Sequence, residues 1–236
     1  MWSAVRSPFY STRNKIGFNI VDKLVKQSNL FSKPLFHFLL IITICSIVYS
    51  NTLEVPFVFD DKSVIVENPI IRDLGYMVNP SEAKVHNGHF EYESFRHRYI
   101  GYLTFALNYW IHKLDVTGYH LVNLAIHILN GLIVYWLVIL TFRTPFLNSS
   151  NLKGCLNEIA LFTSLLFACH PLQTQAVTYI WQRVTSLSVT FYGLSLVLYI
   201  LWRLTSKKTS SFAFQMPILF YLGSVISAVL AMKTKE

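Results

Sequence analysis

The sequence predicts an all-α membrane protein that crosses the bilayer about five times, with an outer loop that carries short interfacial helices. Of the 236 residues, 53% are hydrophobic and 14% are charged, and the mean hydropathy is +0.43. Soluble globular chains carry about a quarter charged residues. Apolar runs of about 20 residues, the length that a helix needs to span a bilayer, recur along the chain. The basic residues gather in alternate segments between these runs, as they do in membrane proteins.

Residues 1–34 form a basic segment before the first apolar run. Residues 35–53 contain no charge over 19 positions and predict the first span. A cleavable signal peptide is an alternative, but Tyr49-Ser50-Asn51 after the apolar run does not match the small-x-small pattern of a signal-peptide cleavage site. A mitochondrial presequence is a further alternative, which the later spans disfavour. The segment has one acid, Asp22, and six bases: Arg6, Arg13, Lys15, Lys23, Lys26 and Lys33.

A polar stretch follows the first span. Residues 54–98 hold eight acids and five bases, and the dipeptides Asn68-Pro69 and Asn79-Pro80 are turn signals. A segment of this length is too long for a plain connection and predicts a small lid. In residues 99–114 the apolar side chains recur at helical spacing among many aromatic ones, so we expect an amphipathic helix in the membrane interface. Together these segments make an outer loop over residues 54–118.

One later apolar run is too short to cross by itself. Residues 159–169 have only 11 positions before His170-Pro171. This run can cross only if the helix continues, broken or kinked, through residues 172–181. The other predicted spans are residues 119–142, 184–204 and 212–232.

The basic residues predict the orientation. With the N-terminus on the cytoplasmic side, the bases of residues 143–158 and 203–208 share that side, and the net-acidic residues 54–98 lie opposite. Lys233 and Lys235 are the exception, because they follow the last span on the outer side. The net charge of +8 therefore reflects topology, and no nucleic-acid partner is expected, since spans separate the bases. The three cysteines form no disulfide or zinc pattern.

The first candidate site is Asp60-Asp61, which lies just beyond the first span. Paired acids there could act as a general base or hold a divalent cation. A lipid phosphate would lie at the same depth. The alternative is an ordinary solvated acidic turn.

The second candidate site is the string from His170 to Gln175, together with Arg183. Polar groups near membrane depth usually face a cavity, and the planar guanidinium suits a phosphate. An interfacial loop anchored by Trp181 is the alternative.

A polar stripe is the third candidate. His120, Asn123, His127 and Asn130 are spaced 3–4–3, which puts them on one face of a helix. This face should contact protein or water, because lipid offers no hydrogen-bond partners for these polar side chains. The pattern favours helix–helix hydrogen bonding over a ligand site.

Four strings in series resemble motifs of the transmembrane and tetratricopeptide-repeat glycosyltransferases. The likeness covers residues 35–236, and the order and spacing of the strings match. They are residues 57–61 with Asn68-Pro69, residues 102–109 with 118–127, residues 170–177 with Gln182-Arg183, and Lys235-Glu236.

This resemblance implies a GT-C type membrane enzyme that takes a sugar, often mannose, from a polyprenyl-phosphate donor. The enzyme would transfer the sugar on the non-cytoplasmic face to a Ser or Thr hydroxyl of a protein. Asp60 then corresponds to the base that activates the acceptor, with Asp61 as second choice. The candidates for binding the donor phosphate are Arg183 and Lys235. The further cavity candidates are His120, Asn123, His127, His170 and Gln175, and the metal requirement stays open.

Three features depart from the family pattern. Gln175 stands where related sequences often have Glu, and Arg96-His-Arg98-Tyr99 stands where many have Arg-Pro. Relatives also continue through more spans and a repeat domain, whereas no 34-residue repeat occurs here. We therefore expect the chain to be the N-terminal portion of a longer enzyme, inactive alone, in a bacterial inner membrane or an endoplasmic reticulum. The alternatives are a non-enzymatic transporter or channel subunit, an assembly factor, or an inactive truncated gene product.

Overall fold

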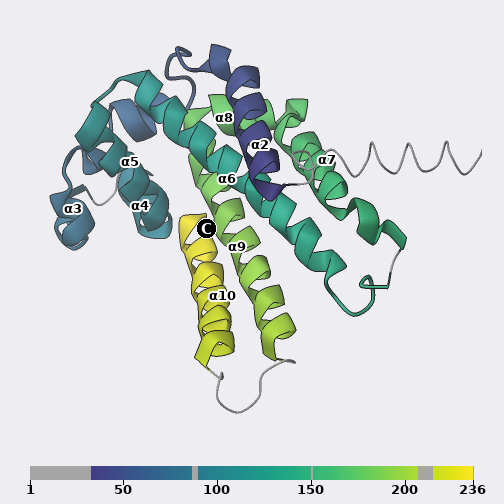
Figure 1. The fold of residues 1–236 in the computed structure, drawn as a ribbon. Helices are drawn as coiled ribbons and strands as arrows, with labels where there is room; N and C mark the ends of the chain where they lie inside the picture. Colours follow the sequence, from purple (N-terminus) through teal and green to yellow (C-terminus); the bar gives the residue numbers. More distant parts are fainter. Residues whose placement is uncertain (1–32, 87–89, 150, 207–214, 236) are drawn as a thin grey trace, which may run out of the picture. The chain divides into compact units, whose positions relative to one another are not determined.

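A computed structural model of the chain describes residues 33–86, 90–149, 151–206 and 215–235. These residues form helices and turns, with no strand among them, which confirms the all-α prediction (Figure 1). Contacts divide the chain into two units, residues 1–39 and 40–236. The first unit is described only from residue 33, so nearly all of the predicted basic segment lies outside the described residues.

Three helices are long and apolar enough to cross a membrane: α6 (Val116–Phe142), α9 (Arg183–Ser206, preceded by the turn from Ile180) and α10 (Gln215–Thr234). At about 1.5 Å per residue, α6 exceeds the roughly 30 Å of the hydrocarbon core. α9 and α10 lie side by side and run in opposite directions, and α9 also packs on α6 (Figure 1). Each of these helices matches a predicted span within a few residues, although the predicted start at residue 212 lies outside the described part.

Two apolar helices are shorter than a span. They are α2 (Pro34–Val48) and α7 (Leu156–Ala168). α7 does not continue toward Trp181, because His170 adopts an extended backbone (ψ 133°) and Pro171 begins a new turn. A short helix, α8 (Thr174–Thr178), then follows. The chain is therefore broken at the His-Pro dipeptide, as expected of a run interrupted by proline.

The segment between α2 and α6 is a packed set of short helices. It contains α3 (Gly75–Val78), α4 (Phe90–His97) and α5 (Tyr99–His112). It also contains the π turn Lys62–Val66 and the 3₁₀ turns Ser50–Thr52, Ile70–Arg72 and Glu82–His86. Three further 3₁₀ turns follow α6: Asn151–Cys155, Pro171–Gln173 and Ile180–Gln182.

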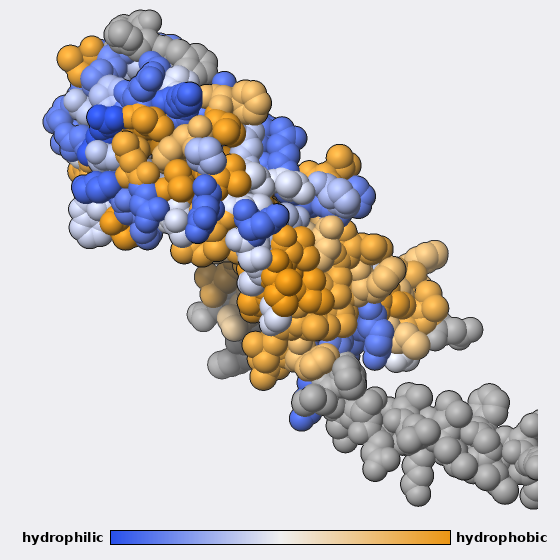
Figure 2. Space-filling model, turned by 90° about the horizontal axis from the view of Figure 1, so that it is seen from above, coloured by the Kyte–Doolittle hydropathy of each residue, from blue (hydrophilic) through white to orange (hydrophobic). Residues whose placement is uncertain are grey.

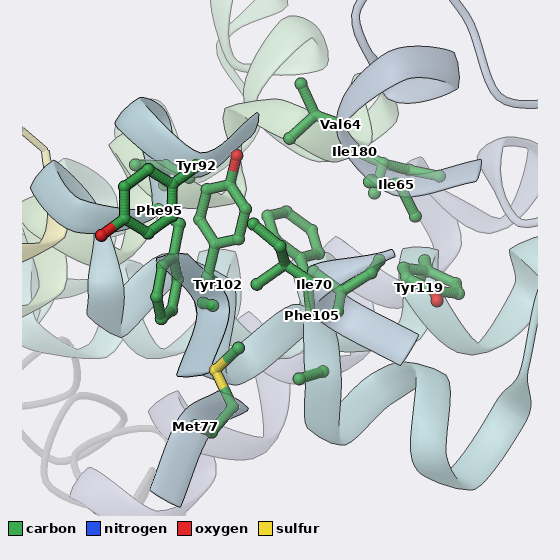
Figure 3. Close-up of a cluster of buried hydrophobic side chains, with 14 residues drawn as sticks. Val64, Ile65, Ile70, Met77, Tyr92, Phe95, Tyr102, Phe105, Tyr119 and Ile180 are labelled. Carbon is green, nitrogen blue, oxygen red and sulfur yellow. The ribbon is translucent and has the colours of Figure 1, made fainter. Parts of the chain in front are cut away.

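An aromatic core holds this segment together. Phe95 of α4 meets Tyr102 of α5 edge-on, with ring centroids 5.6 Å apart, and Phe105 stacks on Trp181 at 5.6 Å. Figure 3 shows these α4 and α5 side chains gathered with Ile70 and neighbouring aliphatic residues. Because Ile180 belongs to the same buried cluster, the core joins the segment to the start of α9.

The turn between α5 and α6 is tight. Asp115 caps α6 by accepting a hydrogen bond from the Thr117 backbone N–H at 3.0 Å. Gly118 lies so close to His112 that a Cβ would approach its ring carbon to 2.3 Å. Only glycine fits here without moving the neighbouring helix.

Apolar side chains cover much of the outer surface. On α5 the predicted apolar stripe is exposed at Leu107, Trp110 and Ile111, while the opposite face is buried. Figure 2 shows a continuous hydrophobic area next to an area of largely hydrophilic residues. A soluble protein rarely exposes so large an apolar surface, whereas lipid covers it in a membrane. With the three long apolar helices, this surface supports an integral membrane protein.

Candidate functional site

The two acids after α2 differ in exposure. Phe59, which precedes them, has a φ of 50°, a left-handed conformation that is unusual for a bulky residue. This conformation turns the chain sharply before the π turn. After this turn Asp60 is exposed, whereas Asp61 is completely buried.

Asp61 links two distant parts of the chain. One carboxylate oxygen accepts a hydrogen bond from the Val58 N–H at 3.1 Å, and the other accepts one from the Trp181 N–H at 2.8 Å. Burial raises the pKa of the Asp61 carboxyl, and these backbone N–H donors oppose that shift. A general base must reach the proton that it removes. Since no part of Asp61 is exposed, its position fits fixing the Asp60 turn onto the start of α9.

Asp60 receives a hydrogen bond from Tyr179. The phenol O–H donates to a carboxylate oxygen at 2.8 Å. Partial burial, with a smaller contribution from the neighbouring Asp60 carboxylate, raises the pKa of Tyr179 to about 12. The phenol therefore stays protonated at neutral pH, and it orients one oxygen of Asp60 while leaving the other available.

Asp60 lines a small cavity with two bases. This cavity, which we name the Asp60 pocket, has a volume of about 220 Å³. Its lining residues are Asp60, Arg98, Trp181, Gln182, Val184, Thr185 and Lys235. They come from the turn after α2, the start of α5, the start of α9 and the end of α10. Residues far apart in sequence thus place one acid and two bases around one space.

The two bases of the pocket retain free hydrogen-bonding capacity. Arg98 lies 5.6 Å above the Trp181 ring and makes one long contact, 3.4 Å, to the Ser94 hydroxyl. Its Nε is buried and finds no hydrogen-bond partner within the described residues. Lys235 is exposed, and no ion pair joins either base to Asp60 in the described part of the chain. The pocket can therefore accept an anion between them.

Arg183 lies elsewhere, fully buried between α5, α6 and α9. Its Nε donates to the Asn123 side-chain oxygen at 2.7 Å. One Nη donates to the Asn108 side-chain oxygen at 2.8 Å and to the Tyr119 carbonyl at 3.0 Å. The guanidinium also lies 4.5 Å from the centre of the Phe105 ring. Arg183 thus joins three helices and does not line the Asp60 pocket, although the sequence suggested it for phosphate binding.

Comparison with known proteins gives consistent relatives. Over 176 residues the chain is 32% identical to Protein O-mannosyl-transferase Tmtc3 of Drosophila melanogaster. This match covers 68% of the chain and 18% of that protein. It is also 32% identical over 183 residues to Protein O-mannosyl-transferase F38B6.6 of Caenorhabditis elegans, a match that covers 72% of the chain and 24% of that relative. The human protein O-mannosyl-transferase TMTC3 is 32% identical over 159 residues, a match that covers 65% of the chain and 16% of that protein. The chain belongs to the TMTC protein O-mannosyl-transferase family.

The match extends over only part of each relative. The chain spans less than a quarter of the length of these curated TMTC proteins. No family model matches the sequence. No solved structure matches it either.

In this TMTC-family chain the polar stripe of α6 bonds to backbone carbonyls of neighbouring segments. His120 and His127 each place Nε2 2.8 Å from a backbone carbonyl, of Val55 and of Ala168 respectively. The Asn123 amide donates to the Ile180 carbonyl at 3.3 Å, and that of Asn130 donates to the Ser186 carbonyl at 3.0 Å. All four side chains are buried. The contacts of His127 and Asn130 join α6 to α7 and α9, as the helix–helix interpretation expects, whereas those of His120 and Asn123 join it to a loop and a 3₁₀ turn.

The His-Pro string also lies outside the Asp60 pocket. His170 and Gln175 are exposed, and the Nδ1 of His170 accepts a long hydrogen bond, 3.3 Å, from the Leu172 N–H. Among the described residues, no group of three or more His, Cys, Asp or Glu side chains is arranged to hold a metal ion.

Two residues of the site had no assigned role in the sequence interpretation: Tyr179, which bonds to Asp60, and Arg98, which lines the pocket. Tyr179 has no motif of its own, and its only signal was its place two residues before Trp181 in a string already singled out. Arg98 was noted only as one base of an acidic loop and within Arg96-His-Arg98-Tyr99, which departs from the family pattern. In both cases the role depends on a contact across more than 80 residues of sequence, with Asp60 or with Trp181.

Proposed function

We propose that this chain forms the N-terminal part of a GT-C type membrane glycosyltransferase that transfers mannose from a polyprenyl-phosphate donor to a Ser or Thr hydroxyl of a protein. The main support is the Asp60 pocket, in which one exposed acid lies with two bases at one end of the long helices. The names of the relatives supply the sugar and the protein acceptor. The polyprenyl-phosphate donor is what the motif resemblance implies, and the two bases of the pocket are consistent with its phosphate.

In this proposal Asp60 is the catalytic base. Its carboxylate takes the proton of the acceptor hydroxyl as that oxygen attacks the anomeric carbon. The bond from the anomeric carbon to the phosphate oxygen breaks, and the lipid phosphate leaves with the electron pair. Lys235 and Arg98 stabilise the negative charge on the departing phosphate. We assign phosphate binding to this pair and a positioning role to Arg183, because its Nε and one Nη already donate to buried acceptors on α5 and α6.

An apolar groove adjoins the pocket and supports a lipid-linked donor. It lies between α9 and α10, has a volume of about 350 Å³, and shares Lys235 with the Asp60 pocket. Apolar side chains such as Val189 and Met232 line it. A phosphate held at Lys235 would direct its isoprenoid chain along this groove toward the membrane interior.

The proposed topology places the pocket on the non-cytoplasmic face. Five helices would cross, namely the three long ones together with α2 and the broken α7–α8 segment, and the N-terminus would be cytoplasmic. The start of α9 and the end of α10 both line the Asp60 pocket, which is consistent with this arrangement. The exposed apolar stripe of α5 would then lie on the outer membrane surface.

Donor binding by the chain in lipid nanodiscs tests this proposal. We expect wild type to bind polyprenyl-phosphate mannose, and Lys235→Gln and Arg98→Gln each to weaken binding at least about tenfold, since each removes a charge-assisted contact. Lys62→Gln, an exposed lysine outside the pocket, is the matched control. Equal affinity in all four proteins, or no binding by wild type, would refute the donor assignment.

A further inference from the structure

A second cavity combines basic and aromatic side chains. It lies against α4, the start of α5 and the outer end of α10, and has a volume of about 530 Å³. We name it the α4–α10 pocket. The lining includes three bases and three aromatic residues: Lys84, Arg96, Lys233, Tyr92, Phe95 and Tyr99. It contains no acid, and it shares no residue with the Asp60 pocket.

The three bases converge from separate elements. Lys84 comes from the turn Glu82–His86, Arg96 from α4, and Lys233 from the last turn of α10. Arg96 is partly neutralised, because its Nη1 lies 3.4 Å from a Glu93 oxygen on the solvent side. Lys84 and Lys233 are exposed and form no ion pair within the described residues, so they determine the charge of the pocket.

The pocket accounts for a feature that the charge pattern left unexplained. Lys233 and Lys235 break the positive-inside rule, because both lie at the end of α10 with the net-acidic loop. Lys235 lines the Asp60 pocket, whereas Lys233 lines the α4–α10 pocket. Each exceptional lysine therefore faces a different cavity.

Size and composition indicate the kind of ligand. A cavity of about 530 Å³ is in the range that holds a drug-sized molecule and is larger than a phosphate ion needs. Apolar residues make up most of the lining, with Leu230 and Ile100 on the side of the membrane helix. The ligand should then have an anionic head and an apolar body. Because α10 is a candidate membrane span, such a molecule would enter from the bilayer.

We propose that the α4–α10 pocket binds the phosphate headgroup of an anionic phospholipid, separately from the sugar donor. Lys84 and Lys233 contact the phosphate, and the rings of Tyr92, Phe95 and Tyr99 cover the glycerol and the first part of an acyl chain. A lipid bound there contacts α4 and α10 at once, so it fixes the outer loop against the membrane helix. This proposal does not depend on the chain transferring a sugar.

Native mass spectrometry of the purified chain in detergent tests the proposal, with short-chain phosphatidylglycerol as probe. Short-chain phosphatidylcholine and inorganic phosphate are the comparison ligands. We expect phosphatidylglycerol to bind at least about tenfold more tightly than either comparison ligand. Inorganic phosphate that binds as tightly as phosphatidylglycerol would contradict a lipid ligand, and equal binding of the two lipids would contradict an anionic one.

Variants then locate the site. Lys84→Gln/Lys233→Gln should weaken phosphatidylglycerol binding at least about tenfold and leave polyprenyl-phosphate mannose binding intact. The double replacement by arginine should restore lipid binding, which shows that charge is the cause rather than misfolding. Lys62→Gln/Lys113→Gln removes the same charge from exposed lysines elsewhere and should bind like wild type. If both Gln double variants bind the lipid equally well, the proposed site is wrong.

Discussion

Replacing Arg183 by methionine removes the side chain that joins α5, α6 and α9. Its three shortest hydrogen bonds, at 2.7, 2.8 and 3.0 Å, end on Asn123, Asn108 and the Tyr119 carbonyl. Each buried acceptor left without a donor costs about 1–3 kcal/mol. Removing a buried charge offsets part of this loss. We expect the free energy of unfolding to fall by about 3–5 kcal/mol, a large part of the stability of a typical domain.

Thermal unfolding in nanodiscs, measured together with donor affinity, decides the role of Arg183. The control is Arg203→Met, which removes an exposed arginine from the same helix and should change stability by about 0.5 kcal/mol or less. Arg183→Met should unfold at a much lower temperature than this control, and the fraction still folded should bind the donor. If instead Arg183→Met is as stable as the control but has lost donor binding, Arg183 binds phosphate directly and our assignment is wrong.

Three further predictions concern the same region. Asp61→Asn should lower the free energy of unfolding by about 1–3 kcal/mol, because the amide nitrogen faces one of two backbone N–H donors; an unchanged melting temperature would contradict the linking role. Gly118→Ala should destabilise by about 1–3 kcal/mol through overlap with His112, whereas Gly154→Ala, with nothing within 4 Å, should be neutral; equal melting temperatures would contradict the tight turn. Tyr179→Phe should leave the melting temperature unchanged and lower sugar transfer about tenfold, because the exposed carboxylate of the pocket loses its orienting O–H; an unaltered transfer rate would show that this hydrogen bond does not matter.

Sequence patterns predicted most of the helices because their signals are local. The apolar run at residues 119–142 predicted α6 within a few positions, and the structure starts the helix three residues earlier, after the cap at Asp115. The helical spacing in residues 99–114 likewise gave α5, and its stripe is on the exposed face. The first apolar run gave a shorter helix than expected, since α2 ends at Val48 and a 3₁₀ turn follows.

The candidate site was only partly predictable, because its electrostatics depend on distant contacts. The sequence singled out Asp60 and Lys235 but could not show that they line one pocket. It also treated Asp60 and Asp61 as near equivalents, although the structure exposes the first and buries the second. Arg183 belongs to a motif that suggested phosphate binding, yet its Nε and one Nη donate hydrogen bonds to Asn123 of α6 and Asn108 of α5. No local pattern in the sequence encodes that arrangement.

The most direct test of the account compares donor affinity and transfer rate in Asp60→Asn. Transfer is measured in a chimera in which this chain replaces the matching region of a TMTC relative, with polyprenyl-phosphate mannose and a Ser/Thr peptide. The substitution removes a negative charge beside Lys235 and Arg98, so donor affinity should stay equal or increase. Transfer should fall about 10²–10⁴-fold, because no base accepts the hydroxyl proton. A transfer rate equal to wild type, with donor binding intact, would contradict Asp60 as the catalytic base.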